Sequence, residues 1–277
     1  MDTRALASEF GVEVVGLDLH REILAGNVEG LARQVVELFE THELLLFRDQ
    51  SLDAAEQVIV AEWLGPISLQ GDAMGGEQGG KVMNISNSTP DGIAGEGPLL
   101  LHSDFCFMEH PLKALLLYGV EIPDQGGNTL FAHGGLAYRD LPPALKQQIA
   151  PLEAVHNYDF SYPRGDVRFR ASQMTPGGHT AKHPVVWSHP DTGEPILYVN
   201  RLMTDRIEGL PEPQSERLLD ALIDNIQDDA HMYEHEWRVG DLVIWDNRII
   251  QHGRTPYDDV SENRTLRRVP VEGGPTS

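Results

Sequence analysis

The stretch Leu101-His102-Ser103-Asp104-Phe105 is the most informative part of the chain. Read as a β-strand, it places the side chains of His102 and Asp104 on one face, because side chains alternate along a strand. An imidazole and a carboxylate side by side provide two of the three ligands of a facial metal site. A third candidate, His252, lies far downstream in residues 249–253 (IIQHG). Two histidines and one carboxylate on one face of an octahedral ion leave the other face open, as in non-heme Fe(II) oxygenases.

The composition is that of an ordinary globular chain, apart from its charge. The 277 residues are 40% hydrophobic, and the net charge is −22. So acidic a chain is not expected to bind nucleic acid or an anionic membrane nonspecifically. A single cysteine, Cys106, excludes an intramolecular disulfide and fits a reducing compartment. Residues 1–10 lack the features of a signal peptide, and no apolar run approaches the roughly 20 residues that cross a bilayer. We therefore expect a cytoplasmic protein.

Short strand-like segments separated by glycine and proline turns dominate the chain. Helices are expected over residues 28–41 and 213–227, and Ser51 is expected to cap another helix. The pattern predicts a mainly β fold with flanking helices, a jelly-roll-like core in one domain spanning residues 1–277. The expected strands are residues 12–19, 43–48, 82–86, 113–121, 129–132, 152–158, 195–200, 233–237, 241–245 and 264–271.

A glycine-rich tract precedes the first histidine of the candidate site. Residues 75–81 (GGEQGGK) match part of a phosphate-binding loop, but Val82 stands where a Ser or Thr should hold Mg²⁺. No apolar strand precedes the match, and a strand rather than a helix follows it. We therefore interpret residues 70–99 as a mobile lid over the site.

Residues 231–235 (HMYEH) match the inverted zinc-peptidase motif H-x-x-E-H. That motif requires a helix, so that both imidazoles reach one ion. The surrounding alternation indicates a strand, in which His231 and His235 lie roughly 13 Å apart at about 3.3 Å per residue. A zinc hydrolase using His231, Glu234 and His235 remains the alternative function.

The C-terminal segment carries two arginines that share one face of a predicted strand. Arg264 and Arg268 point one way and Arg267 points the other. Two buried guanidinium groups are costly unless they meet anions, so they either pair with core acids or bind an anionic ligand. Cys106 is interpreted as a small buried apolar side chain rather than a nucleophile.

Several further motifs occur in a characteristic order, and with them the chain resembles a known family. It is similar to the Fe(II)- and 2-oxoglutarate-dependent dioxygenases of the taurine dioxygenase/2,4-dichlorophenoxyacetate dioxygenase family. The resemblance runs from Gly11 to Val269. The motifs are His102-Ser-Asp104, Gly126-Gly-Asn-Thr129-Leu-Phe, His183-Pro-Val-Val, His189-Pro-Asp-Thr-Gly, Gly240-Asp-Leu-Val-Ile-Trp-Asp-Asn-Arg and Arg264 to Arg268.

The resemblance implies a double-stranded β-helix and a role for six residues. His102, Asp104 and His252 correspond to the iron ligands. Thr129 and Arg264 correspond to the residues that bind the distal carboxylate of 2-oxoglutarate. Arg268 matches a position that contacts an anionic substrate group in some members. His133, His183 and His189 are interpreted as structural hydrogen-bonding residues.

The reaction implied is oxidation, most simply hydroxylation, of a small and anionic organic substrate, with O₂ consumed and succinate and CO₂ released. Asp104 argues against halogenation, because halogenases of this scaffold leave the carboxylate position vacant for chloride. Cys106, Phe107 and Met108 are expected to add apolar lining to the substrate site. A non-catalytic β-barrel binding protein is the remaining alternative, and homo-oligomer formation is left open.

Overall fold

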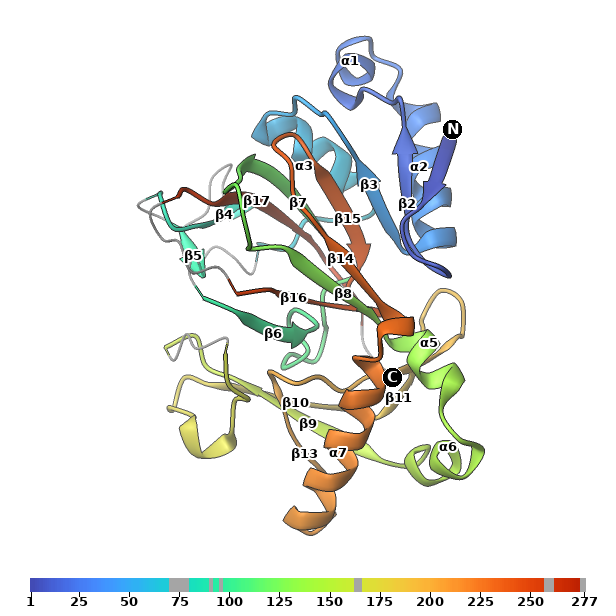
Figure 1. Cartoon of the computed structure of the whole chain (residues 1–277), viewed down its shortest axis with the longest axis vertical. Helices are drawn as coiled ribbons and strands as arrows, with labels where there is room; N and C mark the ends of the chain where they lie inside the picture. Colours follow the sequence, from blue (N-terminus) through green and yellow to red (C-terminus); the bar gives the residue numbers. More distant parts are fainter. Residues whose placement is uncertain (70–79, 90–91, 95–96, 162–165, 257–261, 275–277) are drawn as a thin grey trace.

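The computed structural model describes residues 1–69, 80–89, 92–94, 97–161, 166–256 and 262–274. These residues form a mainly β fold with flanking helices, as the sequence predicts (Figure 1). One sheet has eight strands in the order β1-β2-β3-β15-β7-β17-β4-β5, and another has four in the order β14-β8-β16-β6. Smaller sheets, β10-β9-β13 and β11-β12, complete the β structure of the described residues.

The bounds of the strands follow the chain. They are β1 Asp2–Ala5, β2 Val12–Val15, β3 Leu44–Phe47, β4 Met83–Ser86, β5 Ile93–Ala94, β6 Leu99–His102, β7 Ala114–Glu121, β8 Thr129–His133, β9 Glu153–Tyr158, β10 His179–Pro184, β11 Val186–Ser188, β12 Pro195–Leu197, β13 Thr204–Ile207, β14 Met232–His235, β15 Leu242–Asp246, β16 Ile250–Arg254 and β17 Thr265–Val271. The helices are α1 Leu19–Leu24, α2 Val28–His42, α3 Ala54–Glu62, α5 Gly134–Asp140, α6 Pro143–Ile149 and α7 Glu212–Ile226.

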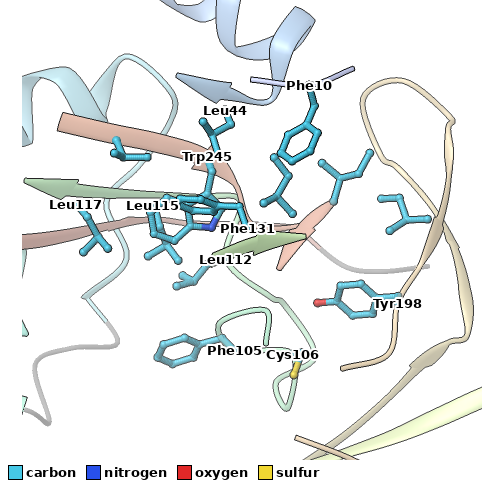
Figure 2. Close-up of a cluster of buried hydrophobic side chains, with 14 of the residues drawn as sticks. Phe10, Leu44, Phe105, Cys106, Leu112, Leu115, Leu117, Phe131, Tyr198 and Trp245 are labelled. Atoms are coloured by element: carbon cyan, nitrogen blue, oxygen red, sulfur yellow. The ribbon is translucent and has the colours of Figure 1, made fainter. Parts of the chain in front are cut away.

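The eight-stranded sheet is covered on both faces, which explains why its central strands are continuous apolar runs. In β3, Leu44 and Leu46 belong to the core cluster that faces the four-stranded sheet, whereas Leu45 and Phe47 belong to the cluster under α2 and α3. Alternate residues therefore face opposite sides, and both sides are buried. The inner cluster packs around Trp245, as Figure 2 shows.

Two helices, α2 and α3, cover the outer face of the eight-stranded sheet. Helix α2 buries Leu31, Val35 and Phe39, which recur at helical spacing as predicted. Helix α3 begins later than expected, because its N-cap is Asp53 and not Ser51. Asp53 and Glu56 form a capping box, in which each side chain accepts a hydrogen bond from the other residue's backbone N–H.

The four-stranded sheet buries its other face under α5, α6 and α7. The cluster there joins sheet residues such as Leu101 and Ala132 to Leu219 and Leu222 of α7. In Figure 1, α7 lies beside β9 and β13 on this side of the molecule. Helices thus cover the outer face of each large sheet, and the inner faces of the two sheets face each other.

Several element boundaries differ from the sequence prediction. The strand predicted over residues 12–19 ends at Val15, because Asp18 caps the unpredicted helix α1 by accepting from the Arg21 backbone N–H. Of the predicted lid, residues 83–86 form β4, which pairs with β17 in the eight-stranded sheet, while residues 70–79, 90–91 and 95–96 lie outside the described residues. The partial phosphate-loop match at residues 75–81 falls largely outside them too. No described helix has both the length and the apolar character needed to cross a bilayer.

Candidate active site

A cavity of about 520 Å³ lies between the two large sheets. Residues of β4, β7, β15 and β17 line it from the eight-stranded sheet, and residues of β6, β8 and β16 line it from the four-stranded sheet. All six site residues predicted from the sequence are among its lining residues: His102, Asp104, Thr129, His252, Arg264 and Arg268. Folding therefore brings together residues up to 166 positions apart in the sequence.

His102, Asp104 and His252 offer three ligand atoms that lie within 4.8 Å of one another. The Nε2 atom of His102 is 3.3 Å from Asp104 Oδ1, and the Nε2 atom of His252 is 3.9 Å from Asp104 Oδ2. Within the described ranges this is the one group of three acidic, histidine or cysteine residues close enough to hold an ion. Two imidazoles and a carboxylate are the donor set of a 2-His-1-carboxylate metal site.

The two imidazoles present their nitrogen lone pairs to the shared centre. Nδ1 of His102 lies 2.9 Å from the Leu100 carbonyl oxygen, which can only accept, so Nδ1 carries the proton and Nε2 is free to bind a metal. Burial, assisted by the neighbouring His102 ring, lowers the pKa of His252 to about 3. A neutral imidazole is the form that ligates a metal. The residues therefore fit a divalent ion.

Asp104 does not sit in the strand that the sequence predicted for it. β6 ends at His102, and Asp104 lies in the turn that follows, where Phe105 has a left-handed backbone with φ 61°. Strict alternation beyond His102 is therefore wrong, although both side chains still meet. The Asn247 side chain fixes this turn: its Oδ1 accepts from the Asp104 backbone N–H at 2.8 Å, and its Nδ2 donates to the Asp104 carbonyl at 2.9 Å.

Asn247 is a residue whose role the sequence analysis missed. It is fully buried in the turn between β15 and β16, and its Nδ2 also donates to the Leu112 carbonyl at 3.0 Å. The only signal was its place in residues 240–248, a motif quoted for the family without any role for this side chain. Asn247 thus holds the backbone of one candidate ligand, 143 residues away, in place.

Arg268 reaches the same carboxylate from β17. Its Nη2 donates to Asp104 Oδ2 at 2.7 Å, and both side chains are mostly buried. Burial opposes ionisation of Asp104, but the Arg268 guanidinium and the two imidazoles outweigh it and hold the pKa of this carboxyl well below its usual range. Arg267 points to the opposite side of the sheet, where it bonds Gln57 and stacks on Tyr118, as the alternation predicted.

Arg264 and Thr129 both line the cavity. The guanidinium of Arg264 donates through Nε and Nη2 to the Gly127 carbonyl, at 3.1 and 2.7 Å. Gly127 has φ +67°, and a Cβ there would lie 2.7 Å from Arg264 Nε, so only glycine lets this carbonyl and the arginine meet. The Thr129 hydroxyl accepts a hydrogen bond from Trp237 Nε1 at 2.9 Å.

One wall of the cavity is aromatic. Phe105, Phe107, Tyr158 and Phe160 all line it, and the rings of Phe107 and Tyr158 stack with centroids 4.9 Å apart. Phe107 was expected as apolar lining, but Cys106 and Met108 are not among the lining residues. Cys106 is fully buried behind the wall against Asn200 and Met203, and burial raises the pKa of its thiol to about 12, as suits a core residue.

The zinc-hydrolase alternative is not supported by the geometry. Residues 232–235 form strand β14, and the two histidines have separate partners: His231 contacts the Asn225 carbonyl and Asp140, whereas His235 Nε2 lies 3.2 Å from Asp241 Oδ2. The three histidines expected to be structural are hydrogen-bonded accordingly. His133 pairs with Glu43, His183 with the Met108 carbonyl and His189 with Asp246.

Comparison with known proteins agrees with this site. The family model described as "Taurine catabolism dioxygenase TauD, TfdA family" matches residues 2–269. The chain is 29% identical to an (S)-phenoxypropionate/alpha-ketoglutarate-dioxygenase of Sphingobium herbicidovorans, covering 100% of this chain and 96% of the relative. It is also 29% identical to an alkylsulfatase of Acinetobacter baylyi, covering 100% and 86%.

The fold is also similar to that of a solved structure, AAD-2 in complex with Mn(II) and N-oxalylglycine. The two superpose with a TM-score of 0.83 at 28% identity, over 100% of this chain and 99% of the other. The match of family, sequence and structure spans the strands that carry the His102, Asp104 and His252 cluster. The chain therefore belongs to the TauD/TfdA family of 2-oxoglutarate-dependent dioxygenases.

Proposed function

We propose that His102, Asp104 and His252 bind Fe(II), that Arg264 and Thr129 bind the distal carboxylate of 2-oxoglutarate, and that the enzyme hydroxylates a small organic anion. The convergence of two imidazoles and one ionised carboxylate within 4.8 Å carries the proposal. When bound, iron supplies the activation of O₂ that couples substrate oxidation to the conversion of 2-oxoglutarate into succinate and CO₂. Three protein ligands leave positions open for the cosubstrate and O₂.

The protein's own contribution is to hold charges and exclude water. Arg264, whose guanidinium donates to the Gly127 carbonyl through Nε and Nη2, is the cation that we assign to the far carboxylate of the cosubstrate. The hydroxyl of Thr129 adds a further donor beside it. Because Arg268 holds one oxygen of Asp104, the other oxygen, Oδ1, faces His102 and is the one we assign to the metal.

The charge of the cavity supports an anionic substrate. Among the described lining residues, three are arginines (Arg254, Arg264 and Arg268) and one, Asp104, is a carboxylate, although the whole chain carries a net charge of −22. Arg268 has five N–H groups, of which one hydrogen-bonds Asp104, so it can also bind a substrate carboxylate or sulfate. The two relatives described above are named for a carboxylate and for alkyl sulfates.

The aromatic wall supports a substrate with a planar apolar part. Four aromatic rings gather on one side of the cavity, and Phe160 is 40% exposed at its edge. Such rings bind an apolar group by contact and stacking. We therefore propose an aryl or similarly planar organic anion, with its charge at Arg268 and its apolar part against Phe105, Phe107, Tyr158 and Phe160.

We further propose that the two large sheets are the halves of a double-stranded β-helix in a single domain spanning residues 1–277. The opposed inner faces, which share the core around Trp245, support this architecture. The glycine-rich segment 70–99 is proposed to carry a lid, apart from residues 83–86, which form β4 in the eight-stranded sheet. One buried cysteine is compatible with work in the cytoplasm.

A paired substrate screen tests the proposal. The protein with Fe(II), 2-oxoglutarate and O₂ is offered aryloxyalkanoates, alkyl sulfates and the neutral amide of each carboxylate, and succinate is measured. Succinate formation stimulated by an anion and not by its neutral amide is the expected result. Succinate formation with no preference for the anion contradicts the substrate class, and no 2-oxoglutarate consumption with any compound contradicts the reaction class.

A further inference from the structure

Trp237 makes a buried contact with the cosubstrate site that the family motifs do not assign. Its indole Nε1 donates to Thr129 Oγ1 at 2.9 Å, and the two residues are only 7% and 3% exposed. Thr129 lines the cavity, whereas Trp237 is not among the lining residues and lies behind it. The hydrogen bond to Thr129 therefore links Trp237 to a ligand in the cavity, which Trp237 itself does not line.

The direction of this hydrogen bond fixes what Thr129 can offer to the cavity. An indole N–H is a donor only, so the threonine oxygen must be the acceptor. Its single hydroxyl proton is then left for another acceptor, and among the residues that the structure describes no acceptor for it is present. An acceptor in the cavity, such as a carboxylate, can then take the hydrogen bond from the Thr129 hydroxyl.

Neighbouring groups hold the indole in this position. The His235 ring meets it edge-to-face with centroids 4.6 Å apart, and His235 is the cross-strand partner of Thr129. Nε2 of His235 lies 3.2 Å from Asp241, whose carboxylate also accepts from Arg48 and from the Arg238 backbone N–H. His235, the last residue of the H-x-x-E-H motif, thus supports the wall of the cosubstrate site.

We propose that Trp237 is a positioning residue for 2-oxoglutarate: by occupying the Thr129 oxygen as acceptor, it directs the hydroxyl proton toward the distal carboxylate of the cosubstrate. This inference rests on the proposed function, in which Thr129 and Arg264 bind that carboxylate. It parallels the action of the Gly127 carbonyl, which fixes the Arg264 guanidinium from behind. Both anchors are then oriented before the cosubstrate arrives.

The test compares 2-oxo acids with and without a distal carboxylate. Trp237→Phe keeps a ring and removes the donor. Calorimetry of the Mn(II)-loaded protein should show about 3- to 10-fold weaker 2-oxoglutarate binding, the loss of one net hydrogen bond. Binding of 2-oxobutanoate, which lacks the distal carboxylate, should not change. In turnover, the KM for 2-oxoglutarate should rise with kcat at saturation unchanged.

A double-mutant comparison separates orientation from packing. In a Thr129→Val background, Trp237→Phe should add no further loss of 2-oxoglutarate affinity. The matched control is Trp187→Phe, another buried indole of the same core cluster, stacked edge-on against Tyr198, which should leave the affinity unchanged. Trp237→Leu replaces the Phe variant if that protein does not fold.

Three results would overturn the assignment of Trp237: unchanged 2-oxoglutarate binding, equal weakening of 2-oxobutanoate, or an equal further loss in the Thr129→Val protein. If the wild-type protein binds 2-oxoglutarate and Trp237→Phe gives one of these results, the inference is wrong and the proposed function stands. A wild-type protein that binds no 2-oxoglutarate with Mn(II) present removes both.

Discussion

Replacing Asn247 by alanine should weaken metal binding without touching a metal ligand. The buried side chain makes three hydrogen bonds, two to the backbone of Asp104 and one to the Leu112 carbonyl. At about 1 kcal/mol each, their loss should lower the free energy of unfolding by about 3 kcal/mol. Because the turn that carries Asp104 is then no longer fixed, affinity for Mn(II) should fall about 10- to 100-fold, the usual effect of losing a partner behind a ligand.

The assay measures stability and metal affinity on the same proteins. Urea unfolding of the metal-free protein gives the first quantity, and titration with Mn(II) gives the second. The matched control is Gln57→Ala, because Gln57 is equally buried and its amide contacts Leu116 and Arg267 on the outer face of the sheet. Gln57→Ala should lose similar stability and keep its metal affinity. The same loss of Mn(II) affinity in both variants, or none in Asn247→Ala, would refute the reasoning.

Three other perturbations test separate parts of the site. Arg264→Ala should raise the 2-oxoglutarate requirement far more than it changes iron binding; an unchanged requirement in steady-state assays would mean that another cation holds the cosubstrate. Arg268→Ala should lower turnover of the anionic substrate by at least about 10-fold, the cost of roughly 1.4 kcal/mol of binding, while slow uncoupled succinate formation persists; intact turnover would exclude Arg268 as the substrate anchor. Asp246 is buried, and Arg248 and His189 outweigh that burial and lower its pKa from 3.8 to about 2, so its ionised form adds about 2 kcal/mol of stability. Since the folded pKa is depressed, this stability is present above about pH 4 and is lost as pH falls toward 2, and the difference in urea midpoint between wild type and Asp246→Asn should shrink over that range; a pH-independent difference would contradict the assignment.

The strands and helices whose apolar residues recur at a regular spacing were predictable from the sequence. The apolar runs of β3, β7 and β15 are buried on both faces, and alternation places Arg267 and Arg268 on opposite sides of β17 as expected. The clustering of His102 and His252 depends on the pairing of strands β6 and β16, which no local sequence pattern predicts. The two residues are direct cross-strand partners of β6 and β16. A strand was expected at His102, but the strand that carries His252 was not predicted.

The unpredicted features depend on contacts between distant segments. Asp104 lies in a turn with Phe105 at φ 61°, a conformation that tertiary contacts with Asn247 stabilise. Trp237 and Thr129 are 108 positions apart, and no local sequence pattern around either residue predicts their hydrogen bond. Helix α5 begins at Gly134 and has the His133 side chain as its N-cap, which helix propensity alone does not predict.

An anaerobic titration with Fe(II) and 2-oxoglutarate, followed by visible absorption, tests the central claim most directly. The account predicts a metal-to-ligand charge-transfer band in the wild-type protein only when both are present, and a weakened or altered band in Asp104→Ala. Admission of O₂ should then abolish the band and release succinate. No band in the wild type, or a band that Asp104→Ala leaves unchanged, would contradict the assignment of His102, Asp104 and His252 to the metal.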